Sequence, residues 1–237
     1  MHKNLTMFAV LLSLVLIFGA QPTFAASTAT IYVVHGIDGR DLGLAKELPV
    51  DIKVNGACAL KNVTFGTITG AIKLPTGMYS IAVSLADGGA GCTNPKVVGL
   101  NNVKLTSSTN ATIVADNSPS GLRLSVFKND LSRPFLNGSR VVVRHTANAP
   151  AVDIMARRTG SRVVMGTIVK KLTDGKQRSR ELIPGKWDIA VIPSGTTTPV
   201  FGPVTLSLRS RTVYFAYAVG SPANGTFTVL TQAIPSR

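Results

Sequence analysis

Short apolar runs recur along the chain, and bulky residues occupy every second position within many of them. Ile31 and Val33 belong to one such run, and Val141 and Val143 belong to another. A period of two is typical of β-strands that bury one face. Turn-forming pairs such as Asn55–Gly56 separate the runs, and the sequence contains no amphipathic stretch long enough for a helix of about twelve residues. The pattern predicts an all-β chain.

The runs occur twice in the same order, which predicts an internal duplication. Four segments of the first copy correspond to four of the second: Ile31–His35 to Val141–His145, Leu48–Ile52 to Pro150–Ile154, Phe65–Thr69 to Met165–Val169, and Leu74–Val83 to Ile183–Val191. Short strands spaced about ten residues apart are typical of β-sandwiches. We therefore predict two tandem antiparallel β-sandwich domains, Ig-like or transthyretin-like, over residues 28–129 and 138–236.

The positions of the bulky residues shift from even to odd numbers between two neighbouring runs of the second copy. Val204–Leu208 has its apolar residues at even positions, whereas Val213–Tyr217 has bulky residues at odd ones too. This change predicts a turn at Arg209–Arg211 that joins the two runs in a hairpin.

Residues 1–25 have the features of a secretory signal peptide. A basic start at His2 and Lys3 precedes an apolar run from Met7 to Phe18, and the small residues Thr23 and Ala25 predict cleavage after Ala25. A retained anchor helix is the alternative, although the run is short for a membrane span of about 20 residues. We expect a periplasmic or secreted protein whose mature chain has no transmembrane span.

The chain contains two cysteines, Cys58 and Cys92. Outside the cytoplasm such a pair favours a disulfide over a metal site. A structural zinc site normally needs four ligands, and only His35 and His145 could add to the thiols in the mature chain. The sequence therefore predicts a disulfide and no metal or cofactor.

Several motifs follow one another in a fixed order. A strand ending at His145 leads into Ala149-Pro-Ala-Val-Asp153, then into Met165-Gly-Thr167 and finally into an Ile-Ala-Val strand. In this order the chain resembles the bacterial extracytoplasmic family of domains of unknown function numbered 4397. The second copy matches more clearly, because the first has a longer loop at residues 36–47. The resemblance implies a secreted or surface β-sandwich module, often in tandem, without an established catalytic residue.

Each copy also repeats a histidine and an aspartate, His35 with Asp51 and His145 with Asp153. We predict a structural role, in which a His–Asp hydrogen bond fixes the loop between them. Ligand binding and catalysis are the alternatives. Triad chemistry would need a nucleophile as well, and no serine stands in a Gly-x-Ser-x-Gly elbow.

Positive charge is concentrated in the second copy. The whole chain has 25 Lys and Arg against 11 Asp and Glu, a formal net charge of +14. Residues 27–129 have nine basic and six acidic residues (+3), whereas residues 130–237 have fifteen and five (+10). The candidate anion-binding residues are Arg157, Arg158, Lys170, Lys171, Lys176, Arg178 and Arg180. Such a field favours an anionic envelope polymer, an acidic glycan or a lipid head group; the alternative is a charged surface that only aids solubility.

These features favour a non-enzymatic, extracytoplasmic binding or envelope-associated module. One alternative is a hydrolase-type enzyme that uses a His–Asp site, which would require a cleft containing both residues. Another is a structural surface subunit that assembles through exposed strand edges, although residues 26–30 and 231–237 are short for completing a neighbour's sheet.

Overall fold

The computed structural model describes residues 27–89 and 91–237. The predicted signal peptide, residues 1–25, lies outside the described residues. Within the described residues, no helix is long and apolar enough to cross a membrane.

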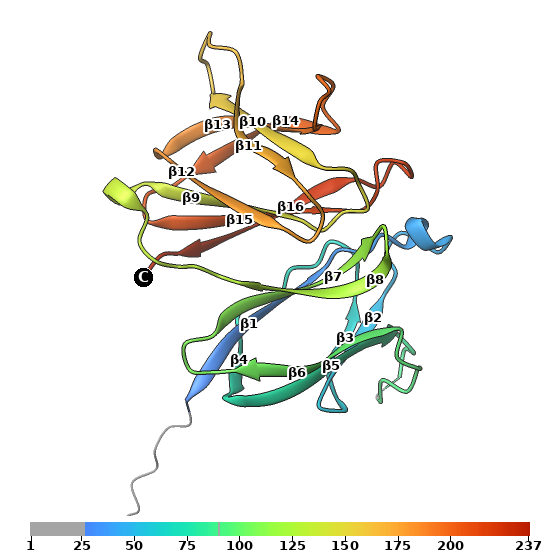
Figure 1. The fold of residues 1–237 in the computed structure, drawn as a ribbon. Coiled ribbons are helices and arrows are strands. Elements are labelled where there is room, and N and C mark those ends of the chain that lie inside the picture. The colour runs from blue at the N-terminus through green and yellow to red at the C-terminus, as the bar shows by residue number, and fades with distance from the viewer. Residues whose placement is uncertain (1–26, 90) are drawn as a thin grey trace, which may run out of the picture.

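The first half of the chain folds into two four-stranded sheets that face each other (Figure 1). Their orders are β4-β1-β7-β8 and β3-β2-β5-β6. The strands are β1 (Thr28–His35), β2 (Val50–Val54), β3 (Ala57–Val63), β4 (Ile72–Pro75), β5 (Gly77–Leu85), β6 (Val98–Leu105), β7 (Asn110–Ser118) and β8 (Gly121–Lys128), and a short 3-10 helix, η1, spans Gly39–Leu42. We call this half domain 1. The Cys58–Cys92 disulfide ties β3 to the loop between β5 and β6.

The second half, which we call domain 2, repeats this arrangement. Its sheets have the orders β12-β9-β15-β16 and β11-β10-β13-β14. The strands are β9 (Ser139–His145), β10 (Val152–Arg158), β11 (Gly166–Leu172), β12 (Gln177–Leu182), β13 (Gly185–Pro193), β14 (Phe201–Leu208), β15 (Thr212–Val219) and β16 (Thr228–Pro235), and a second 3-10 helix, η2, spans Phe135–Asn137. The all-β, two-sandwich fold is confirmed.

One strand pair in each domain is parallel, which the antiparallel prediction did not include. β1 pairs with β7, and β9 pairs with β15, both in parallel register. The strands of each pair are separated in sequence by the whole of the opposite sheet. No tight turn links them, so nothing requires them to run in opposite directions.

The predicted hairpin at Arg209–Arg211 was wrong. β14 pairs with β13, whereas β15 pairs with β9 and β16, so the turn carries the chain from one sheet to the other. The odd positions of β15, such as Phe215 and Tyr217, are bulky because that strand has a second buried face.

Among the described residues, the three largest apolar cores lie within and between the two domains. Each domain has its own core between its sheets. A third core lies between the domains, where the sheet containing β1 and β7 faces the sheet containing β9 and β15 (Figure 1). Its buried members are Tyr32, Val34, Val114, Phe127, Leu131, Val142, Val213, Phe215, Tyr217, Val219 and Ile234. The two domains therefore form one stack of four sheets.

Candidate binding site

Five of the candidate basic residues follow one edge of domain 2. Lys170 and Lys171 stand near the end of β11, Lys176 lies in the following loop, and Arg178 and Arg180 lie on β12. β11 and β12 are edge strands of the two facing sheets. All five residues are exposed, and none forms an ion pair with another described residue. We call this set the basic ribbon.

The sheet register sets the direction of the two arginines. Arg178 pairs with Val143 and Arg180 with Val141, and both valines belong to the core of domain 2. The two arginine side chains therefore project from the same face of the sheet as these valines. Because β12 is an edge strand, these long side chains can leave the sandwich at its side. The Nε of Arg180 donates to the carbonyl of Ile168 on β11, 2.5 Å away. Arg180 thus spans the gap between the two edge strands, whereas Arg178 donates to the carbonyl of Gln177 on its own strand.

Arg157 and Arg158 do not join the basic ribbon. They lie at the end of β10, whereas Lys171 lies beside Asp153 near its start, about 15 Å along the strand. Arg157 forms an ion pair with Asp188 at 3.3 Å. The guanidinium of Arg158 stacks over Trp187, 5.9 Å from the ring centroid. The seven candidate residues therefore form two separate groups.

A polar cavity of about 530 Å³ borders the basic ribbon at the seam between the domains. It reaches Gln177, which lies between Lys176 and Arg178, and it is also lined by Lys128, Asp130 and Arg237. Asp130 is paired with Arg140 at 3.1 Å. The cavity offers hydrogen-bonding groups next to the exposed cations.

The predicted His–Asp hydrogen bonds were wrong. The Nε2 of His35 lies 2.8 Å from the carbonyl oxygen of Leu48, and that of His145 lies 2.9 Å from the carbonyl oxygen of Pro150. Each imidazole therefore fixes its loop through the backbone. Burial lowers the pKa of both histidines below the usual value, so both are neutral at neutral pH.

The two aspartates hold β-bulges instead. Oδ1 of Asp51 accepts from the backbone amide of Asn62 at 2.9 Å, and Oδ1 of Asp153 accepts from that of Lys171 at 2.7 Å. Asn62 and Lys171 both have positive φ, 52° and 48°. Register shifts mark both strand pairs at these positions. The repeated motif thus stabilises a kinked edge strand in each domain.

The four repeated residues lie away from the principal cavities of the described part of the chain. Among the described residues, neither histidine and neither aspartate lines any of the five principal cavities. The same part of the chain contains no group of three His, Cys, Asp or Glu side chains that could hold a metal ion. The four repeated residues act on loop and strand geometry.

A buried arginine at the domain interface was missed by the sequence analysis. Arg144 on β9 is fully buried, with its guanidinium between 4.5 and 5.3 Å from the ring centroids of Phe127, Phe215 and Tyr217. It donates to Asn129 Oδ1 at 2.7 Å and to Tyr217 Oη at 3.1 Å. Burial lowers the pKa of Arg144 to about 10. The sequence does contain a sign of this buried arginine, because Arg144 directly follows the apolar run Val141–Val143. A charged residue in a buried strand needs a specific partner.

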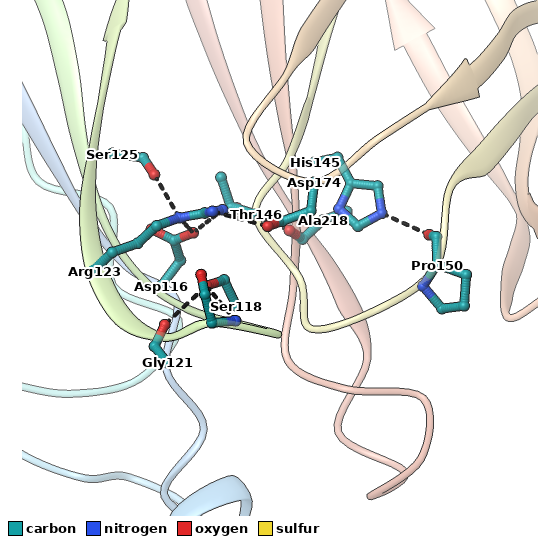
Figure 2. A network of polar contacts seen from close by, with 11 residues as sticks. Asp116, Ser118, Gly121, Arg123, Ser125, His145, Thr146, Pro150, Asp174 and Ala218 are labelled. Atoms are coloured by element: carbon teal, nitrogen blue, oxygen red, sulfur yellow. Dashed lines mark hydrogen bonds and ion pairs between the residues drawn. The ribbon is translucent and has the colours of Figure 1, made fainter.

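A second polar contact crosses the interface (Figure 2). Arg123 on β8 binds Asp116 of its own domain at 2.7 Å and Asp174 of domain 2 at 2.5 Å. Thr146, close to this group in Figure 2, donates its hydroxyl to the carbonyl of Ala218 at 2.8 Å. Arg123 therefore joins the two domains at the β11–β12 loop, which also contains Lys176 of the basic ribbon.

Comparison with known proteins places the chain in a family. The family model described as a domain of unknown function, DUF4397, matches residues 21–155, more than half of the 237 residues. The chain belongs to this family. A comparison with curated protein sequences gave no match.

The DUF4397 match covers domain 1 and extends through β9 into β10. It includes His35, Asp51, His145 and Asp153, and therefore both copies of the loop and bulge motif. The motifs at Met165–Val169 and Ile183–Val191 lie beyond it. These motifs belong to domain 2, whose sheets repeat the strand order of domain 1.

Solved structures resemble this DUF4397 protein only weakly. A candidate cell adhesion protein of Bacteroides ovatus is 11% identical, with a TM-score of 0.29, and the alignment covers 90% of this chain and 98% of that one. A second, from Bacteroides uniformis, is 11% identical with a TM-score of 0.26, covering 91% and 99%. The fold described above rests on the strand pairings of this chain alone.

Proposed function

We propose that this protein is a non-enzymatic, periplasmic or secreted, envelope-associated module that binds an anionic polymer along the basic ribbon. The observation that carries the proposal is the set of five exposed cations, none of them paired with a described carboxylate. Cations left without internal partners can attract an external anion, and they do so over a distance set by salt screening.

The shape of the ribbon favours a polymer over a small anion. Its charges follow two strand edges and a loop, from Lys170 to Arg180, instead of converging on one pocket. An extended chain with repeated negative charges can contact several of them at once. The neighbouring seam cavity, with Gln177 and Lys128, could hydrogen-bond sugar hydroxyls.

An acidic glycan fits better than a nucleic acid. Proteins that bind single-stranded nucleic acids place aromatic side chains between the cations, so that bases can stack on them. Residues 170–180 contain no Phe, Tyr or Trp. The surface therefore supplies charge and hydrogen bonds without a platform for bases.

Binding to heparin, an acidic glycan, at increasing NaCl concentrations tests the proposal. The variant Lys176→Gln/Arg178→Gln/Arg180→Gln should bind more weakly, and the slope of log affinity against log salt should fall by up to about three, one per lost contact. The matched control, Lys61→Gln/Lys96→Gln/Lys104→Gln, removes three exposed charges from domain 1 and should change binding little. Equal losses in both variants, or binding that is independent of salt, would contradict a ribbon-specific site.

A further inference from the structure

Domain 2 contains an apolar cavity of about 290 Å³ between its two sheets. Val143, Ala216 and Val229 line it from one sheet, and Ile189 and Phe201 line it from the other. The lining residues are apolar except for Thr205 and Thr231. The cavity lies toward β14 and β16, the edge strands on the side opposite the basic ribbon.

The duplication shows which residues open this space. In parallel register, Val33 of β1 pairs with Ile113, and the corresponding Val143 of β9 pairs with Ala216. Across the next strand pair, Ile113 faces Val126 whereas Ala216 faces Thr231. The same comparison places Val229 where domain 1 has Leu124. Smaller or more polar side chains therefore line this wall of domain 2.

The two domains also differ at the edge beside this wall. In domain 1, β6 and β8 approach each other and close the edge, whereas β14 and β16 of domain 2 remain further apart. Val204 on β14 is 44% exposed although it lines the cavity, so it marks an opening to solvent. Domain 1 has a smaller cavity of about 150 Å³, lined instead by β3 and β4 residues such as Leu60 and Leu74.

The size and lining of the cavity define the compound that fits it. Protein interiors are normally close-packed, and an apolar cavity of about 150 Å³ holds a benzene molecule. Twice that volume accepts roughly ten to twelve carbon atoms. No charged side chain lines the cavity, and neither β14 nor β16 contains Asp, Glu, Lys or Arg. An ionised head group inside would have no partner, which is costly.

We infer that the cavity between the sheets of domain 2 is a binding site for an uncharged alkyl compound of about ten carbons. Thr231 lines the cavity and is one of its two lining residues with a hydroxyl, so it can provide a hydrogen bond to one hydroxyl or carbonyl of the ligand. The site is separate from the basic ribbon, so it stands whether or not the protein binds an anionic polymer.

Titration of the full mature chain with 1-decanol tests this inference, with methyl NMR shifts as the readout. Decanol should shift the methyl signals of Ala216, Val229 and Ile189 and leave those of domain 1 unchanged. Affinity should rise along the series of 1-alcohols up to about ten to twelve carbons and rise no further beyond it. Decanoate and decylammonium should bind at least about tenfold more weakly. Absence of shifts at saturating decanol would overturn the inference.

The variant Ala216→Ile restores the residue that domain 1 has at this position. It should fold, with a thermal midpoint at or above that of the wild type, and bind decanol at least about tenfold more weakly. Ala216→Val serves as the milder substitution if the larger one impairs folding. Arg178→Gln/Arg180→Gln should weaken heparin binding without changing decanol binding. Unchanged decanol affinity in a folded Ala216→Ile protein would contradict the assignment.

Discussion

At the scale of single residues, the interface network places one carboxylate in an unusual environment. Asp116 is fully buried and shares the guanidinium of Arg123 with Asp174. Burial raises the pKa of Asp116 to about 6, against an ordinary value of 3.8, despite the neighbouring arginine. The folded protein therefore holds a proton there that the unfolded chain releases at lower pH.

This shift predicts a stability change with a definite sign. Between about pH 4 and 6 the folded state binds more protons at Asp116 than the unfolded state, so this residue's contribution to stability falls as pH rises. The change should amount to up to about 3 kcal/mol. Urea unfolding of the wild type and Asp116→Asn at several pH values measures it, because the variant should lack this component.

Asp87 provides the control for that measurement. Hydrogen bonds from the Thr93 hydroxyl and the Thr93 and Gly89 amides lower the pKa of Asp87 to about 2. Asp87→Asn should therefore leave the pH dependence between 4 and 6 as in the wild type. If Asp116→Asn and the wild type lose stability in parallel over this range, Asp116 does not titrate there.

At the scale of strands, the bulge aspartates explain why the same motif stands in both copies. Asp153 accepts hydrogen bonds from the Lys171 amide and, at 2.6 Å, from the Ser194 hydroxyl. Lys171 has a positive φ, which is unfavourable for a residue with a side chain. The carboxylate compensates by satisfying an amide that the irregular pairing leaves without a strand partner.

We expect Asp153→Ala to lower the free energy of unfolding by about 1–3 kcal/mol, because the Lys171 amide would lose its acceptor. Asp153→Asn should cost less, since its side-chain oxygen can still accept. Urea unfolding at neutral pH gives the comparison, with Glu47→Ala as a control at an exposed acidic residue. Equal stability of the Ala variant and the wild type would show that the bulge does not depend on this carboxylate.

The fold could be predicted from sequence because its signals are local. Alternation in runs such as Val141–Val143 and the ordered duplication sufficed for strands and sandwiches. The predicted His–Asp hydrogen bond was wrong, because Asp153 instead accepts from the Lys171 amide at a bulge, and no sequence pattern marks that bulge. The edge position of Arg178 depends on which strands pair, and the cavity beside Ala216 depends on how far β14 and β16 separate.

At the scale of the whole molecule, an apolar core joins the inner sheets of the two sandwiches. β1, β7, β9 and β15 are buried on both faces. Strands of this kind are almost continuously apolar, as Val213–Ala218 is, because neither face meets water. The sequence shows this apolar run. However, bulky residues at both odd and even positions can indicate either a strand with two buried faces or a turn that shifts the alternation, and the pattern alone does not distinguish the two.

The interface should therefore couple the unfolding of the two domains. We expect the wild type to unfold in one calorimetric transition, with equal van't Hoff and calorimetric enthalpies. Phe215 is fully buried in the interdomain core and contacts Arg144. Phe215→Ala should remove about 3–5 kcal/mol of packing there and separate the scan into two transitions, or lower its van't Hoff enthalpy below the calorimetric one. Val97→Ala, at a loop residue that is 52% exposed, should leave the single transition intact. Two independent transitions in the wild type would mean that the interdomain core contributes little to cooperativity.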